Sequence, residues 1–231
     1  MYCPLRRRFS KAVSQALRRG LCLLLAFPPL IGRAAPSEEE LFFKNISEVN
    51  DGELRFLAKA PDRQVHHHQN HITLTPDSLV SGWVKLEQCH QHLDPVPSTQ
   101  IVYHQERIRA LRITRVENIE RAWVEDNSVQ MENIKHDALL CIEAESRALL
   151  DDGPDAHVLL NGPYMRRFLD GYYPMRVTMT VSLGGSGLRF DSLTPAAQPG
   201  FTVHISQDEA GYDTWFEGRL VTRIRFVARN R

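Results

Sequence analysis

The sequence has no net charge, few cysteines and no apolar run long enough to cross a bilayer. In 231 residues, 28 Lys and Arg balance 28 Asp and Glu, and only four residues are cysteine. Nucleic-acid-binding proteins usually carry a basic excess, so this balance argues against such a partner. A membrane-spanning helix needs about 20 apolar residues, which excludes a polytopic membrane protein. The hydrophobic fraction of 42% also excludes a collagen or a low-complexity chain.

Several motifs that carry enzymatic chemistry are missing as well. The sequence contains no Gly-x-Ser-x-Gly elbow, no glycine-rich phosphate loop and no His-Glu-x-x-His. The run 184–187 places glycines around a serine, but it follows a strand pattern with no helical pattern behind it. These absences favour a protein that is not an enzyme, although they do not decide the matter.

The neutral balance is the sum of two unlike parts. Residues 1–35 contain seven basic residues and no acidic one, so 21 basic and 28 acidic residues remain in 36–231, a net charge of −7. In the basic part, an apolar run at 21–32 is followed by Ala34 and Ala35, which is typical of a secretory signal peptide. We therefore expect residues 1–35 to be a signal peptide and the mature protein to be periplasmic or extracellular, in a bacterium, with no transmembrane span.

The route of export stays open. The segment 6–11 resembles the twin-arginine export consensus in its arginines, its Phe9 and its Lys11. It departs from that consensus at Ser10, where an apolar residue is usual, and an ordinary basic leader is the alternative.

Two cysteines remain in the mature chain, Cys89 and Cys141. An oxidising compartment makes an even pair a candidate disulfide. Trp123 lies between them, and this pattern resembles the immunoglobulin arrangement of two inter-sheet cysteines around a core tryptophan. Leu139 stands where that arrangement has a tyrosine, two residues before the second cysteine.

Alternation of apolar and polar residues predicts strands along most of the mature chain. The clearest case is 175–183, which is apolar at every odd position and polar at every even one. Further strands are predicted at 53–58, 82–92, 99–104, 108–113, 121–124, 128–131, 138–144, 201–206 and 215–227. Strands at this short spacing predict a mostly β protein, an antiparallel β-sandwich that is immunoglobulin-like in general architecture. Helix is expected only at 37–43 and as a single turn at 165–170.

An acidic, turn-rich run at 151–155 marks a candidate boundary. After the signal peptide at 1–35, it divides the chain into a first β-sandwich-like unit at 36–150 and a second β unit at 151–231. The equal alternative is one continuous sandwich in which 151–155 is a surface loop.

Histidine is the unusual residue of this sequence. Six of the ten histidines fall within 66–92, and imidazoles on adjacent extended segments are a common way to hold Zn²⁺ or Cu²⁺. The candidate metal ligands are His66, His67, His68, His71, His90 and His92. On strands, His66 and His68 would share one face, and His90 and His92 would lie on one side. A free Cys89 would join them, whereas a solvated His-rich loop without function is the alternative.

The segment 161–174 gathers aromatic residues, arginines and turn formers. A ligand or partner loop would use the arginines to clamp a carboxylate or phosphate and the tyrosines to stack on a ligand. The candidate residues are Tyr164, Arg166, Arg167, Tyr172 and Tyr173. The alternative, which we favour, is a fixed connection that turns at 170–171 and covers the edge of the core.

The last 13 residues contain five arginines and no acidic residue. On the predicted final strand, Arg223 and Arg225 share the outward face. This face is either a docking surface for an acidic partner or a charged edge strand protected from aggregation, and we favour the edge strand.

Together these features predict an exported, non-catalytic binding or accessory module. Its partner would be a small ligand or an envelope protein, and a specific version binds Cu or Zn through the histidines. One alternative is a metal-dependent hydrolase or redox enzyme that uses the same histidines, with Glu87 or Asp94 as base. Another is a structural partner in an envelope assembly that docks through 161–174 or the last strand.

Overall fold

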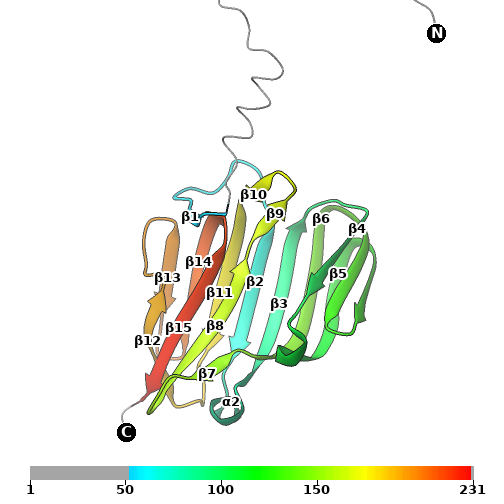
Figure 1. Ribbon diagram of the computed structural model, residues 1–231. Coiled ribbons are helices and arrows are strands. Elements are labelled where there is room, and N and C mark those ends of the chain that lie inside the picture. The colour runs from blue at the N-terminus through cyan, green and yellow to red at the C-terminus, as the bar shows by residue number, and fades with distance from the viewer. Residues whose placement is uncertain (1–51, 230–231) are drawn as a thin grey trace, which may run out of the picture.

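The fold is mostly β, as the alternation predicts (Figure 1). The computed structural model describes residues 52–229, so the signal peptide predicted at 1–35 and the helix predicted at 37–43 lie outside the described residues. Within 52–229, none of the helices has the length and apolar character that crossing a membrane requires.

Nine strands form the larger sheet. In chain order they are β1 (Arg55–Phe56), β2 (His67–Thr73), β3 (Trp83–Leu93), β4 (Ser98–Val102), β5 (Ile108–Glu125), β6 (Ser128–Arg147), β11 (Met175–Ser182), β13 (Phe201–Ile205) and β14 (Glu209–Glu217). Their order across the sheet is β1-β14-β11-β2-β3-β6-β4, with β13 also paired to β14 and β5 to β6. The pairing of β2 with β11 is parallel, unlike the antiparallel pairing predicted.

Four strands form a second sheet, in the order β12-β15-β8-β7. They are β7 (Leu149–Asp151), β8 (Ala156–Tyr164), β12 (Leu188–Thr194) and β15 (Leu220–Ala228). In Figure 1 this sheet lies in front of β14, β11 and β2, and apolar side chains of both sheets belong to one core. The remaining elements are the hairpin of β9 (Arg166–Phe168) and β10 (Gly171–Tyr173), the helix α2 (Pro76–Ser81) and the 3₁₀ turn η1 (Gln105–Arg107).

The alternation at 175–183 has the predicted consequence. In β11 the odd residues are buried, and Val177 and Met179 have no exposed surface, whereas the even residues are half-buried. The core between the sheets also holds large side chains from β13, β14 and β15, including Phe201, Tyr212 and Phe226. The core therefore lies between β11 and β14 on one side and β15 and β8 on the other.

Several predicted bounds were wrong. The strand predicted at 215–227 is two strands in different sheets, because the chain turns at Gly218, which has φ 86°. A Cβ there would lie 2.0 Å from the carbonyl oxygen of Glu53, so no other residue fits this crossing. The helical turn predicted at 165–170 is instead the β9–β10 hairpin. The strands predicted at 108–113 and 121–124 are parts of β5, and those at 128–131 and 138–144 are parts of β6.

The predicted disulfide is confirmed, but its place in the fold differs from the prediction. Cys89 of β3 and Cys141 of β6 are directly opposite in register, with their Cα atoms 4.1 Å apart. Both strands belong to the larger sheet, so this is not the inter-sheet bridge of an immunoglobulin domain. Trp123 is half-buried on β5 under the guanidinium of Arg121, 4.4 Å away, rather than in the core.

Strands from both sides of the run at 151–155 share both sheets. β2 pairs with β11 in the larger sheet, and β7 pairs with β8 in the smaller one. This is the pairing that the alternative of one continuous unit expects, and the boundary between 36–150 and 151–231 stays a prediction.

The run at 151–155 also has a partner in the last strand. β15 lies between β12 and β8, so the interpretation of the last strand as a charged edge was wrong. Arg223 and Arg225 both form ion pairs with Asp152, and Arg225 forms another with Asp191. The arginines of this face are therefore engaged within the molecule.

Candidate functional site

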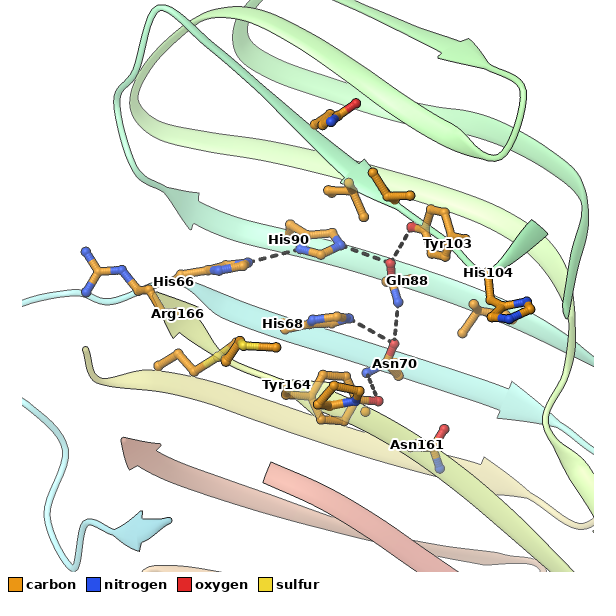
Figure 2. A pocket seen from close by; sticks show the side chains of 18 of the residues that line it. His66, His68, Asn70, Gln88, His90, Tyr103, His104, Asn161, Tyr164 and Arg166 are labelled. Carbon is orange, nitrogen blue, oxygen red and sulfur yellow. Dashed lines mark hydrogen bonds between the residues drawn. The ribbon is translucent and has the colours of Figure 1, made fainter. Parts of the chain in front are cut away.

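A cavity of about 930 Å³ lies between the larger sheet and β8 (Figure 2). Its wall is formed by β2, β3 and β4 on one side and by β8 with the turn to β9 on the other. Cavities of about 300–1,000 Å³ are the usual size of small-molecule sites.

The inner face of β2 and β3 changes from polar to apolar along its length. Opposite residues form three successive cross-strand pairs: His68 with His90, Asn70 with Gln88, and Ile72 with Leu86. All six side chains line the cavity, because residues two apart on a strand point to the same face. The sheet therefore presents imidazoles at one end, amides in the middle and aliphatic groups beyond them.

The polar side chains form one hydrogen-bonded chain, drawn as dashed lines in Figure 2. Gln88 is its centre: Tyr103 Oη donates to Gln88 Oε1 at 2.6 Å, and Gln88 Nε2 donates to Asn70 Oδ1 at 2.8 Å. Asn70 Nδ2 in turn donates to the hydroxyl of Tyr164 on β8, at 3.2 Å. The chain thus ties the larger sheet to the strand that covers it.

Burial keeps the cavity histidines neutral. It lowers the pKa of His66 to about 4 and the pKa of His68 to about 3. The pKa of His90 is also well below 6.5, first through burial and then through the two neighbouring imidazoles. The side chains of His66 and His68 are half-buried, and the surface that they expose faces the cavity rather than the outside of the molecule. The three rings are therefore uncharged hydrogen-bonding groups at neutral pH.

The hydrogen bonds assign the tautomers of these rings. A Gln carbonyl oxygen only accepts, so His90 Nε2 donates to Gln88 Oε1 at 2.9 Å, and His90 Nδ1 is left to accept from His66 Nε2 at 3.0 Å. His68 Nε2 donates to Asn70 Oδ1 at 3.1 Å by the same reasoning. The Nδ1 atoms of His66 and His68 are consequently acceptors, and no group in residues 52–229 donates a hydrogen bond to them.

A charged pair closes the histidine end of the cavity. Arg166 binds both carboxylate oxygens of Asp94, with Nε 2.8 Å from Oδ2, and also donates to the carbonyl of Pro174 at 3.3 Å. The guanidinium lies 5.3 Å from the ring of Phe168 and 5.6 Å from that of Tyr173. The carboxylate that Arg166 clamps thus belongs to the chain itself.

The six candidate metal ligands do not form one group. Only His66, His68 and His90 line the cavity, with ring centroids 4.3–6.2 Å apart. His67 and His71 are on the other face of β2, and they contact Thr178 and Ser182 on β11.

His92 does not join His90, contrary to the prediction. The pairing of β3 with β6 shifts register between Gln91 and Leu93, and His92 has φ 52°. This bulge turns His92 toward Asp137, where its Nδ1 lies 3.3 Å from Oδ1. An irregularity of this kind carries a side chain out of the alternation on which the prediction was based.

The candidate residues of 161–174 separate in a similar way. Tyr164 is buried in the cavity wall, and burial raises its pKa well above its usual value. Arg167 lies 5.5 Å from the ring of Tyr172 on the β9–β10 hairpin, and the hydroxyl of Tyr173 donates to Asp170. Only Tyr164 and the Asp94-bound Arg166, with Arg167 at the edge, contribute to the cavity lining.

The carboxylates considered as catalytic bases are not placed for that role. Glu87 is exposed on the outer face of β3, opposite Glu143 and away from the cavity histidines. Asp94 lines the cavity, but both its oxygens are bound by Arg166. In the part of the chain from 52 to 229, no group of three or more His, Cys, Asp or Glu has the arrangement of a metal site.

Sequence reasoning missed the amides and the phenol that connect the histidines. Asn70, Gln88 and Tyr103 are common residue types without a motif. The signal that points to the amides is their spacing, because Asn70 follows His68 by two residues and Gln88 precedes His90 by two. Uncharged polar residues on the inner face of otherwise apolar strands indicate a buried network.

Comparisons with known protein families, with curated proteins and with solved structures give no match for this chain.

Proposed function

We propose that the chain is an exported, non-catalytic binding protein that takes a small ligand into the cavity between β2, β3 and β8. The observation that carries this proposal is the uncharged polar network of the cavity wall. Small-molecule sites combine a largely apolar lining with a few fixed polar groups, and this cavity has that composition.

Asn161 on β8 supports the proposal independently. Its Nδ2 is buried in the lining and has no hydrogen-bond partner within residues 52–229. Leaving a buried amide donor unpaired costs about 1–3 kcal/mol. Because this nitrogen has almost no exposed surface, an accepting atom of a ligand would pair with it once the Asn161 side chain turns toward the cavity. Acceptor atoms at His66 and His68 face the same cavity, so a ligand with hydroxyl or carbonyl groups finds partners of both kinds.

The disulfide supports the exported location. Cystine persists in oxidising compartments and is rare in the bacterial cytosol, and Cys89 and Cys141 are paired. The charge pattern of residues 1–35 agrees with that location. The cavity would then be accessible to small molecules of the envelope or the medium.

The test uses N-phenyl-1-naphthylamine, an uncharged fluorescent probe that brightens in apolar cavities. We expect saturable binding of one probe per molecule of the mature protein, and loss of binding in Ile72→Trp, which fills the cavity. The matched control is Thr73→Trp, one residue along on the outer face of β2, which should bind normally. Circular dichroism checks that both variants fold, and equal binding by all three proteins would overturn the proposal.

We propose as a second candidate function the binding of Zn²⁺ or Cu²⁺ by His66, His68 and His90 after a rearrangement of the rings, since within residues 52–229 they do not have the arrangement of a metal site. The rings are neutral, and Gln88 and Asn70 hold two of them by their Nε2–H groups, as partners of metal-bound histidines do. Two tetrahedral zinc ligands lie about 3.3 Å apart, close to the 3.0 Å between His66 Nε2 and His90 Nδ1. For both nitrogens to bind one ion, His66 would take its Nδ1–H tautomer and the two rings would turn, because these atoms now face each other along a hydrogen bond.

Isothermal calorimetry with ZnCl₂ and CuCl₂ tests this candidate. We expect His90→Ala to abolish binding and His71→Ala, on the outer face, to leave it intact. Absence of binding to the unaltered protein, or equal binding by both variants, would overturn the proposal of a metal site.

A further inference from the structure

The strands around the cavity line it in two different ways. On β2 and β3 the lining residues alternate, as in His66, His68 and Asn70, because one face of these strands points inward. Along β4 and along β8 with β9 they are consecutive, over 99–104 and 160–168. Consecutive side chains of a strand point to opposite faces, so such a run shares the backbone edge of its strand. The cavity is therefore a groove with the faces of β2 and β3 as its floor and two strand edges as its walls.

The edge of β4 that faces the groove has no strand partner within residues 52–229. β4 pairs with β6, on its other side. On that side the backbone of Tyr103 donates to residue 127 at 2.9 Å, and the carbonyl of Pro97 accepts from residue 133 at 2.8 Å. Because backbone groups alternate in direction along an antiparallel strand, those of Ser98, Gln100 and Val102 point toward the groove.

The composition of β4 leaves this edge open to another strand. It contains two hydroxyl residues, an amide and two aliphatic residues, and none of its five residues is charged. β5, which also pairs only with β6 within the described residues, has arginines and glutamates along its length. Charged residues on an edge strand oppose pairing with another chain, so β5 is guarded and β4 is not. The groove reaches the surface at β4, since Val102 lines it and is 62% exposed.

The opposite wall is open as well. The pairing of β7 with β8 ends at Leu159, and Leu160 donates one further backbone bond on that side. Beyond Leu160, no strand of residues 52–229 pairs with this side of β8. In Figure 2 Tyr164 of this strand lies across the floor from Tyr103, which follows β4. Met165 lines the same wall and is 39% exposed, so a ligand can enter between the two edges.

We propose that the ligand is an extended segment of polypeptide that adds a strand to the free edge of β4. Its backbone exchanges hydrogen bonds with Ser98, Gln100 and Val102, and its alternate side chains point to the floor. Hydroxyl groups suit the positions over His66 and His68, because the Nδ1 atoms of these rings accept hydrogen bonds. A segment of six residues, the length of the lining run at β4, spans about 20 Å. This inference rests on the proposed function and names the class of ligand.

The probe for this inference is the blocked hexapeptide Ac-Thr-Val-Thr-Val-Thr-Val-NH₂, whose hydroxyl groups lie on one face of the extended chain. We expect calorimetry to show one peptide bound per molecule of the mature protein, and the peptide to displace N-phenyl-1-naphthylamine. Two further peptides are N-methylated on the threonines or on the valines, which removes the backbone donors of one edge or the other. One of them should bind at least tenfold more weakly than the parent, and equal binding by all three would overturn the inference.

The matching change in the protein is Gln100→Pro. It removes an N–H group from the free edge of β4 and leaves the ladder to β6 intact, a position at which edge strands tolerate proline. This variant should lose at least tenfold in affinity for the peptide while it binds the dye normally. The control is Gln100→Ala, which keeps the N–H group and should bind both normally. Unchanged peptide affinity in Gln100→Pro would overturn the inference, and if that variant does not fold, the N-methylated peptides decide.

The dye separates this inference from the proposed function. Binding of the dye without binding of the peptide would overturn the inference alone, whereas failure of the dye to bind would overturn the proposed function and the inference with it. Gel filtration tests a second copy of the chain as the occupant. A dimer of the unaltered protein that Gln100→Pro dissociates would assign the edge to that copy and would overturn the inference too.

Discussion

At the scale of single residues, Gln88 connects side chains of the cavity wall that come from three segments, namely β2, β3 and the chain that follows β4. Its carbonyl oxygen accepts from His90 and Tyr103, and its amide nitrogen donates to Asn70. It is buried, so water does not replace any of these bonds when the side chain is changed. Its loss would leave several polar groups without partners.

We therefore expect Gln88→Leu to lower the free energy of unfolding by about 2–4 kcal/mol, because buried donors and acceptors left unpaired are costly. Urea denaturation followed by circular dichroism measures the change. Gln105→Leu, at an exposed position in η1, should stay within about 0.5 kcal/mol of the unaltered protein. A small effect at Gln88 would mean that the network contributes little to stability.

The buried histidines predict a dependence of stability on pH. The pKa of His66 is about 4 and that of His68 about 3 in the folded protein, against about 6.5 when unfolded. Between these values the unfolded chain binds more protons, so the free energy of unfolding is greatest above pH 6.5 and falls as the pH drops toward 4. Each histidine adds at most about 1.4 kcal/mol per pH unit to this slope.

Urea denaturation at pH 7, 6 and 5 measures the slope. His68→Asn should have a shallower slope than the unaltered protein, whereas His104→Asn, at an exposed position, should keep it. The same slope in all three proteins would show that His68 is not held neutral by the fold.

The candidate site was only partly predictable from single residues. Histidines, arginines and tyrosines are noticed by their type, and His66, His68, His90, Tyr164 and Arg166 do line the cavity. The amides between them have no signature of their own. Their role depends on the register of β2 against β3 and on β8, which covers both from a distant part of the chain.

At the scale of elements, β3 and β6 are joined twice, by their ladder of hydrogen bonds and by a covalent bridge. Cys89 and Cys141 are 52 residues apart, so the bridge closes a loop that contains β4 and β5. Restricting such a loop in the unfolded chain stabilises a protein by roughly 3–4 kcal/mol.

The variant with both cysteines changed to Ala should accordingly lose about 3–4 kcal/mol of unfolding free energy relative to the oxidised protein. Guanidinium denaturation, with and without a reductant, makes the comparison. Reduction of the unaltered protein should have a similar effect, and no effect on the double variant.

The strand β11 allows its alternation to be tested by neighbouring substitutions. Met179 has no exposed surface, whereas Thr180 is half-buried on the outer face. We expect Met179→Ala to cost about 2–5 kcal/mol and Thr180→Ala less than 1 kcal/mol. Melting temperatures of the two variants provide the measurement, and similar losses in both would contradict the assignment of faces.

Elements were predictable where the alternation is regular and not where it is interrupted. β11 was found because every odd side chain enters the core. The prediction divided β5 and β6 into shorter strands, because their pairing shifts register near residues with positive φ such as Ala110 and Asn118. Each bulge moves the pattern by one residue, so a count of alternating positions stops there. Clusters of charge along both strands conceal their continuity further.

At the scale of the whole molecule, the two halves of the chain are interleaved. β2 from the first half lies between β3 and β11, and β8 from the second half pairs with β7. Within residues 52–229, neither half contains the whole of the nine-stranded sheet or of the four-stranded sheet.

We therefore expect the unaltered protein to unfold in one cooperative transition and the fragment 36–150 to remain unfolded in isolation. Calorimetry of the whole protein and the dispersion of amide NMR signals of the fragment test this. A well-dispersed spectrum from the fragment would show that the predicted boundary at 151–155 separates independent units.

The parallel pairing of β2 with β11 also has a consequence for the order of synthesis. His67 bonds to Thr178, 111 positions later in the chain, so β2 can form a hairpin with β3 long before its other neighbour has been made. Until then one side of β2 is an open edge with unpaired backbone groups, a template for pairing with another chain. Translocation in an unfolded state, followed by folding of the complete polypeptide, would shorten the period during which that edge is exposed.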